Sequence, residues 1–134
     1  MADLRGFAQR IQAIAREVED GSNELTIQTA LVIDQILVLT TPVDTGRARA
    51  NWLVGIDRPI VEPTDREDPS GGQTIATNNE VIRSRNPEQG IYISNNLPYI
   101  NRLNLGHSAQ APGGFIQAAV KRGIATVRRG RVLG

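Results

Sequence analysis

The sequence of 134 residues contains no cysteine and a single histidine, and both shortages restrict its chemistry. Without cysteine there is no disulfide framework and no thiolate metal site, which fits a reducing compartment. Because His107 is the one histidine, a histidine-rich metal site is excluded, and a Ser-His-Asp set would have to use Ser94 or Ser108. Neither serine has the sequence context of a nucleophile elbow, and we interpret His107 as a loop residue. The sequence predicts no enzyme, no cofactor and no metal site.

Aromatic residues and long apolar runs are also scarce. Aromatic residues make up 4% of the chain, whereas hydrophobic residues make up 40%. We therefore expect an aliphatic, alanine-rich core within a single domain that spans residues 1–134. No run approaches the roughly 20 apolar residues of a membrane helix, so no membrane contact is predicted.

Acidic residues are missing from the C-terminal third of the sequence. The net charge is only +1, but residues 57–88 carry four basic and seven acidic groups, whereas residues 89–134 carry six basic groups and no acidic one. Such a basic end predicts an anionic neighbour, either DNA phosphate or an acidic protein surface. No aromatic residues interleave with these cations for base stacking, so contact with DNA would be limited to its phosphate groups. The acidic 57–88 region of a neighbouring copy explains the charge separation equally well, and we prefer it as the partner. The candidate contact residues are Lys121, Arg122, Arg128, Arg129 and Arg131.

The first forty residues have the periodicity of helices. Apolar residues at spacings of three and four from Leu4 to Val18 predict an amphipathic helix. The same phase continues from Leu25 to Leu39, which predicts either one long helix weakened at Gly21 or two helices nearly in line. Residues 30–39 are apolar almost all round, so we expect this part to be the buried central helix.

A proline ends this helical pattern. Pro42 has no N–H to donate and disfavours helical angles at the residue before it, so the helix is expected to stop here. Asp44 or Thr45 is expected to cap a short turn through residues 47–50. Gly46 is expected to allow a positive φ or a close backbone approach.

A strand and a long polar loop are expected to follow. Trp52 opens an alternating pattern through Ile56 that predicts a strand. Residues 57–73 are rich in proline, glycine and acidic groups, and we expect a loop that extends from the body and is ordered mainly by neighbouring subunits. Ile60-Val61 could add a short strand, and the carboxylates of residues 65–68 are interpreted as a solvated acidic turn.

The rest of the chain alternates short elements. Residues 74–85 predict a helix, and Ile91-Tyr92-Ile93-Ser94 predicts a second strand because β-branched and aromatic residues concentrate there. A turn at residues 95–96, a short helix over residues 99–105 and a closing helix over residues 115–129 complete the pattern. On the closing helix one imperfect face is expected, with Gly123 weakening the middle of the helix, and its residues are Phe115, Ala118, Ala119, Arg122, Ala125 and Val127. The fold class is α+β, with a long N-terminal helix packed on a small sheet.

Two blocks of sequence are more specific than ordinary turn chemistry. The first is Thr41-Pro42-Val43-Asp44-Thr45-Gly46-Arg47-x-Arg49-x-Asn51-Trp52, and the second runs from Ile93-Ser94-Asn95-Asn96-Leu97-Pro98-Tyr99 to Gln110-Ala111-Pro112-Gly113-Gly114-Phe115. Together they resemble the signature of tailed-bacteriophage neck and tail-completion proteins of the lambda minor tail protein Z type. The residues that carry this signature are Pro42, Asp44, Thr45, Gly46, Arg47, Arg49, Trp52, Asn95, Asn96, Pro98 and Tyr99.

The resemblance implies a structural virion protein of the neck, which joins the tail to the head connector. It implies a homo-oligomeric ring of six or twelve copies in contact with other neck, connector and tail proteins, with non-specific contact to packaged DNA. It also implies synthesis in the bacterial host cytoplasm and a final place in the virion. The alternative hypothesis is a small sequence-independent DNA-binding module that uses the basic C-terminal helix.

Overall fold

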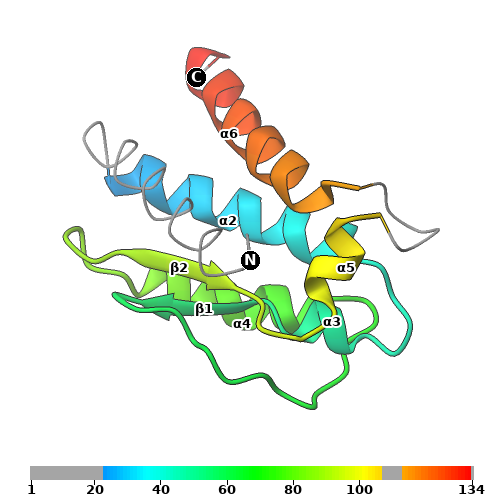
Figure 1. The fold of residues 1–134 in the computed structure, drawn as a ribbon. Coiled ribbons are helices and arrows are strands. Elements are labelled where there is room, and N and C mark those ends of the chain that lie inside the picture. The colour runs from blue at the N-terminus through cyan, green and yellow to red at the C-terminus, as the bar shows by residue number, and fades with distance from the viewer. Residues whose placement is uncertain (1–22, 107–112, 134) are drawn as a thin grey trace.

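The computed structural model describes residues 23–106 and 113–133, which form five helices and one two-stranded sheet (Figure 1). The elements in chain order are α2 (Asn23–Thr40), α3 (Arg47–Ala50), β1 (Leu53–Ile56), α4 (Gly72–Arg83), β2 (Ile91–Ser94), α5 (Ile100–Asn104) and α6 (Phe115–Leu133). The predicted α+β class is confirmed. The predicted helix from Leu4 to Val18, a break at Gly21, His107 and the side chain of Arg131 lie outside the described residues.

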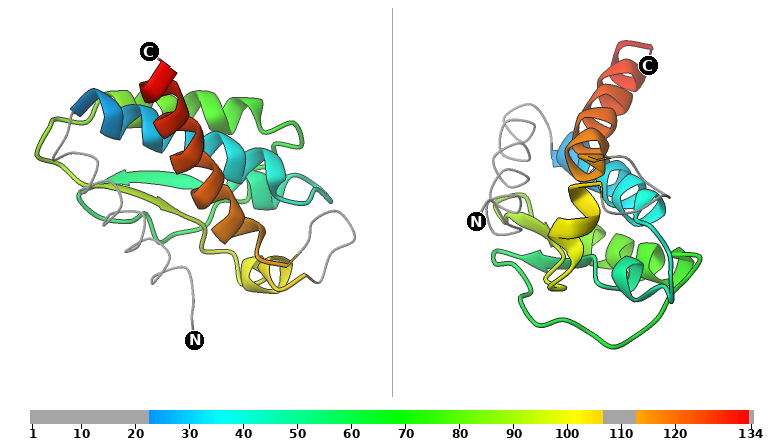
Figure 2. Two further views of the ribbon diagram at one scale, coloured as in Figure 1. Left: turned by 90° about the horizontal axis from the view of Figure 1, so that it is seen from above. Right: turned by 45° about the vertical axis from the view of Figure 1, so that its right-hand side comes forward.

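Helix α2 is the central element of the fold. It lies between α6 on one side and α4 with the sheet on the other (Figures 1 and 2). Ile33 and Leu37 on its inner face are at most 1% exposed. The helix ends at Thr40, which confirms the stop expected from Pro42. Its C-terminal part is not buried all round as predicted, because Gln35 is exposed and Leu39 is 44% exposed.

The sheet is a short antiparallel pair. Its register runs from Leu53 opposite Ser94 to Ile56 opposite Ile91. The strand predicted at Ile60-Val61 is wrong, since these residues form no strand and are exposed. The carbonyl of Ile60 instead accepts hydrogen bonds from Ser94 Oγ at the end of β2, at 3.0 Å, and from Asn96 Nδ2 just after it, at 2.7 Å.

One hydrophobic core joins all the longer elements. It is aliphatic, as the composition predicted, and Trp52 is its largest fully buried side chain. The buried members of this core are Ala30, Ile33, Leu37, Val38, Trp52, Val54, Ile82, Ile91, Ile93, Ile100, Phe115, Ile116 and Ala119.

The buried face of α6 differs from the predicted one. Ala118, Arg122 and Ala125 are exposed, whereas Ile116 and Gly123 are buried. The buried positions 115, 119, 123 and 127 recur at every fourth residue, which is the ridge that packs one helix into the groove of another. The predicted face included Phe115, Ala119 and Val127, which are buried, but it omitted Ile116 and gave Gly123 no packing role.

Gly123 is the point where α6 crosses α2. A Cβ atom at this position would lie 2.5 Å from Ile33 Cγ1 and 3.3 Å from the Ile33 Cα and N atoms. The missing side chain therefore lets the two helices approach closely. Gly123 does not interrupt α6, which continues to Leu133 and passes the predicted end at Arg129.

We predict that Gly123→Ala lowers the free energy of unfolding by about 1–3 kcal/mol, because overpacking against Ile33 outweighs the better helix propensity of alanine. Gly130→Ala is the matched control on the same helix, since nothing lies within 4 Å of a Cβ there. The control is expected to be neutral or to stabilise by up to about 1 kcal/mol. Urea denaturation of the full chain measures both, and equal effects would contradict the close crossing.

Candidate functional site

The segment of residues 41–52, which we call the junction, ties the end of α2 to the start of β1. Trp52 Nε1 donates to Thr41 Oγ1 at 2.8 Å. Thr41 Oγ1 in turn donates to the Leu37 carbonyl at 2.6 Å. Thr41 and Trp52 are both 0% exposed. This chain of hydrogen bonds satisfies the indole N–H inside the core and fixes the angle at which the polypeptide leaves the helix.

Arg49 connects the junction to the end of α2 and to the loop before α4. Its guanidinium donates to the carbonyls of Leu39 and Thr41, each at 2.9 Å. It also donates to the carbonyls of Pro69 at 2.9 Å and Ser70 at 3.4 Å. The last carbonyls of a helix lack intrahelical partners, so a cation in this position both pairs with them and complements the helix dipole.

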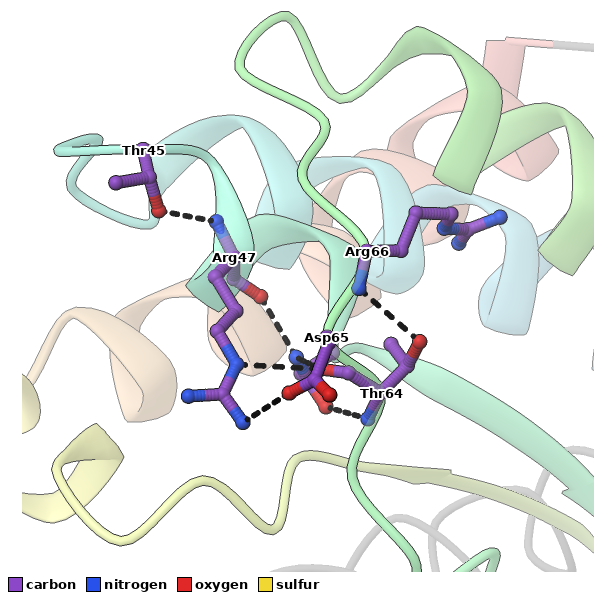
Figure 3. A network of polar contacts seen from close by, with 6 residues as sticks. Thr45, Arg47, Thr64, Asp65 and Arg66 are labelled. Carbon is purple, nitrogen blue, oxygen red and sulfur yellow. Dashed lines mark hydrogen bonds and ion pairs between the residues drawn. The ribbon is translucent and has the colours of Figure 1, made fainter.

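Arg47 and Asn51 hold the middle of the long loop at Thr64 (Figure 3). Asn51 Nδ2 donates to the carbonyls of Thr64 and Arg47, and its Oδ1 accepts from the Thr64 N–H at 2.8 Å. Arg47 Nε donates to the same Thr64 carbonyl at 3.2 Å. The ion pair from Arg47 to Asp65 at 3.1 Å adds little, because the Asp65 side chain is 99% exposed.

Gly46 has both of the features expected from the sequence, a positive φ and a close approach of another backbone segment. Its φ is +91°, and a Cβ atom would lie 2.4 Å from the Pro69 backbone nitrogen. Its carbonyl accepts from the Asp68 N–H at 3.1 Å, so the loop returns directly over the glycine. Of the two proposed capping residues, Thr45 accepts from the Arg47 N–H at 3.2 Å, and Asp44 is exposed.

Asp68 is buried, so the prediction of a solvated acidic turn is wrong for this residue. Its carboxylate accepts from the N–H and the hydroxyl of Thr74, each at 2.7 Å, and thereby caps the first turn of α4. Burial raises the pKa of Asp68, but hydrogen bonds from Thr74 and Gly71 and the charge of Arg66 together hold this pKa below its usual value.

The loop is therefore attached to its own chain at three places. The attachment points are Ile60, Thr64 and the Asp68–Ser70 stretch. Between them Val61, Glu62 and Pro63 are exposed, and the middle of the loop runs outward from the body (Figure 1). From the sequence we expected neighbouring subunits to order the loop. These contacts come instead from the loop's own chain.

The second signature block meets the first inside the molecule. Asn95 is 0% exposed, and its Nδ2 donates to the Ala48 carbonyl at 2.9 Å. Its Oδ1 accepts from the Leu97 N–H at 3.2 Å and forms the predicted turn after β2. Pro98 and Tyr99 are exposed beside the start of α5. Asn95 thus brings two stretches that are 47 residues apart into one framework.

Two hollows adjoin the junction on the protein surface, and Pro42 lines both. The smaller hollow, of about 280 Å³, lies between the end of α2 and the first turns of α6 and includes Leu39, Phe115 and Arg122. The larger, of about 470 Å³, lies beside α3 and α5. Its lining residues are Pro42, Val43, Asp44, Thr45, Gly46, Arg47, Ala48, Glu67, Tyr99 and Leu103.

The basic residues of α6 lie away from the junction framework. Lys121, Arg122, Arg128 and Arg129 are exposed, and the one ion pair recorded within residues 23–106 and 113–130 is Arg47–Asp65. The final turns of α6 project past α2 (Figure 1). These side chains are therefore available to an anionic partner.

A buried carboxylate at Asp34 was missed as a site by the sequence reasoning, which treated it only as an interruption of an apolar run. Asn78 Nδ2 donates to Asp34 Oδ1 at 3.0 Å and to the Trp52 carbonyl at 2.8 Å, which joins α2 and α4 to the residue before β1. Asp34 Oδ2 has no hydrogen-bond partner among the described residues. Burial raises the pKa of Asp34 from 3.8 to about 7, although the Asn78 hydrogen bond lowers it.

In the part of the chain that the structure describes, no three histidine or carboxylate side chains converge to hold a metal ion. Within the same residues, no helix has the length and apolarity needed to cross a membrane. The polar side chains of the junction are instead directed at backbone carbonyls and N–H groups.

We predict that Arg49→Lys lowers the free energy of unfolding by about 1–3 kcal/mol, because an ammonium group cannot reproduce the planar fork that reaches carbonyls on two segments. Arg58→Lys is the control, since Arg58 is an exposed arginine at the start of the loop, and a change within about 0.5 kcal/mol is expected there. Urea unfolding followed by tryptophan fluorescence reports both. A neutral Arg49→Lys would contradict the role of the fork.

We predict a pH dependence of stability that originates at Asp34. Between about pH 4 and about pH 7 the folded chain retains a proton on Asp34 that the unfolded chain releases, so the free energy of unfolding falls as pH rises, by at most about 4 kcal/mol. Above this range the contribution is constant. Asp34→Asn keeps an oxygen acceptor for Asn78 and should remove this slope.

The measurement compares urea midpoints of wild type and Asp34→Asn at about pH 5 and about pH 8. Between these two pH values the urea midpoint is expected to change less for the variant than for wild type. At about pH 8 the variant is expected to be the more stable protein, because it carries no buried charge. Parallel pH profiles for the two proteins would overturn the assignment to Asp34.

Comparison with known proteins adds no relative to this description. No protein-family model matches the sequence, and neither characterised proteins nor solved structures show a significant match.

Proposed function

We propose that the chain is a structural virion protein of a tailed bacteriophage, a neck or tail-completion component that joins the tail to the head connector as an oligomeric ring. Two features of the chain support this proposal. The first is the pair of sequence blocks that resemble the tail-completion signature. The second is the use of those blocks in the fold, where Asn95 hydrogen-bonds to Ala48 and makes one framework of them.

The observation that carries the proposal is the separation of opposite charges on the surface. The acidic loop with Glu62, Asp65 and Glu67 lies at one end of the molecule, and the projecting end of α6 lies at the other (Figures 1 and 2). Arg128 and Arg129 are exposed at that second end. A ring of identical chains requires two different, complementary surfaces on each subunit, and this distribution supplies them.

The chemistry of the junction also favours a structural role. Arg49 and Asn51 make their hydrogen bonds to backbone groups of neighbouring segments. Such contacts fix the positions of segments and leave the surface to make the intermolecular contacts. In this proposal the junction holds the shape of each subunit, while the loop and α6 meet other subunits or connector proteins.

Contact with DNA is the second candidate function, favoured by the exposed Lys121, Arg122, Arg128 and Arg129 on α6. These cations could bind phosphate groups without reading sequence, with an affinity that falls steeply as salt rises. The exposed cations suit the wall of a DNA channel as well as a free DNA-binding module. The two candidate functions differ in whether heads and tails can join without the chain.

We predict that deleting the gene for this chain in the phage that encodes it leaves DNA-filled heads and finished tails unjoined. Electron microscopy of the lysate counts the two kinds of particle, and supplying the chain in trans should restore joined virions. The chain should also be traceable at the neck of intact particles.

Joined and infectious particles in the absence of the chain would contradict the neck assignment. Binding of duplex DNA by the purified chain, lost with Arg128→Gln and Arg129→Gln together, would support the DNA-binding module in its place. These substitutions are preferable to deletion of the helix end, because Val127 on the same turn is buried.

A further inference from the structure

The larger hollow beside α3 and α5, which we call the acidic hollow, has an excess of negative charge at its edge. Asp44 and Glu67 line it, both residues are exposed, and neither forms an ion pair within the described residues. Arg47 also lines the hollow, but its guanidinium is engaged with the Thr64 carbonyl and Asp65 (Figure 3). Within residues 23–106 and 113–130, no cation pairs with either carboxylate.

The other lining residues suit the stem of a long cationic side chain. Pro42, Val43, Ala48 and Leu103 give the hollow apolar walls, and Tyr99 is 36% exposed at the hollow. An arginine packs its methylene groups on apolar surface, pairs its planar head with carboxylates and stacks on aromatic rings. The chemistry of the acidic hollow therefore matches an arginine.

The exposed end of α6 carries arginines that cannot reach the hollow of the same chain. Helix α6 starts beside α5, where the Ile116 N–H donates to Asn104 Oδ1 at 2.9 Å. Arg128 lies thirteen positions after Phe115, which places it about 20 Å further along the helix axis, beyond the length of an arginine side chain. The end of α6 points away from α3 and α5 (Figure 1).

We propose that the acidic hollow is the docking site for the exposed end of α6 of a second copy of this chain, with Arg128 and Arg129 as the inserted cations. The inference rests on the proposed ring and deepens it, because it names the two surfaces that meet. The contact is head-to-tail, since hollow and helix end are different surfaces of each copy. Repetition of such a contact produces a ring where the rotation closes.

Two double variants of the full chain test the contact. The hollow variant combines Asp44→Asn with Glu67→Gln, and the helix variant combines Arg128→Gln with Arg129→Gln. All four residues are exposed, so both variants are expected to fold, as circular dichroism can verify. Sedimentation velocity should show that wild type self-associates and that each variant does so at least about tenfold more weakly.

A mixture of the two variants provides the sharper result. The helix end of the hollow variant is intact, as is the hollow of the helix variant, so one native contact can form between them. The mixture should give heterodimers and no larger species, because each heterodimer has only defective surfaces left. Controls are Glu24→Gln and Arg83→Gln, exposed charges that do not line the hollow, and both should associate like wild type.

Salt provides an independent check of the charge pairing. Raising the salt from about 0.1 M to about 1 M shortens the Debye length from about 10 Å to about 3 Å and should weaken wild-type association. A wild-type chain that remains monomeric at low salt, double variants that associate normally, or a mixture that stays monomeric would each overturn the proposal.

The outcomes for this contact and for the neck function are separable. Heterodimers in the mixture together with normal virions from the gene deletion would keep the contact and remove the neck assignment. Unjoined heads and tails from the deletion, together with normal association of the double variants, would keep the neck assignment and remove this contact.

Discussion

The carbonyl groups at the C-terminal end of α2 impose the constraint on which the rest of the structure depends. A helix leaves its last carbonyls without intrahelical partners, and here Pro42 prevents the helix from continuing to supply them. Arg49 donates to the Leu39 and Thr41 carbonyls, and Thr41 itself donates to the Leu37 carbonyl. Because Arg49 also binds carbonyls 69 and 70, the same interaction positions the segment that leads into α4.

The junction extends this constraint to the rest of the domain. Trp52 is anchored through Thr41, and the residue before it, Asn51, holds Thr64 of the loop through both its side-chain oxygen and nitrogen. Asn95 binds the Ala48 carbonyl and so fixes the chain after β2 relative to α3. A dozen consecutive residues thus position the middle of the loop, the start of β1 and the chain after β2.

Local features of this fold could be predicted from the sequence, because they depend on neighbouring residues. The helix stop at Pro42, the positive φ of Gly46 and the strand of residues 91–94 follow from backbone chemistry within a few positions. The long-range hydrogen bonds of Arg49 and Asn51 could not be predicted. The partners of Arg49 lie 8 to 21 residues away along the chain, and Thr64 lies 13 residues from Asn51.

The errors have the same physical origin. Asp68 is buried because Gly46 brings the loop against the junction, and a charged run gives no sign of such a return. The buried face of α6 depends on Ile33 of another helix, so the packing role of Gly123 is visible only once both helices are in place. Likewise, the acidic hollow combines residues 42–48 with Glu67, Tyr99 and Leu103, and no single stretch contains it.

The close crossing of α6 over α2 has a mechanical consequence. With no side chain at Gly123 to act as a compressible spacer, the backbone of α6 bears directly on Ile33, and packed protein interiors have low compressibility. A force applied to the projecting end of α6 is therefore transmitted to α2 with little deformation of the contact. From α2 it reaches the segment before α4 through the Arg49 guanidinium.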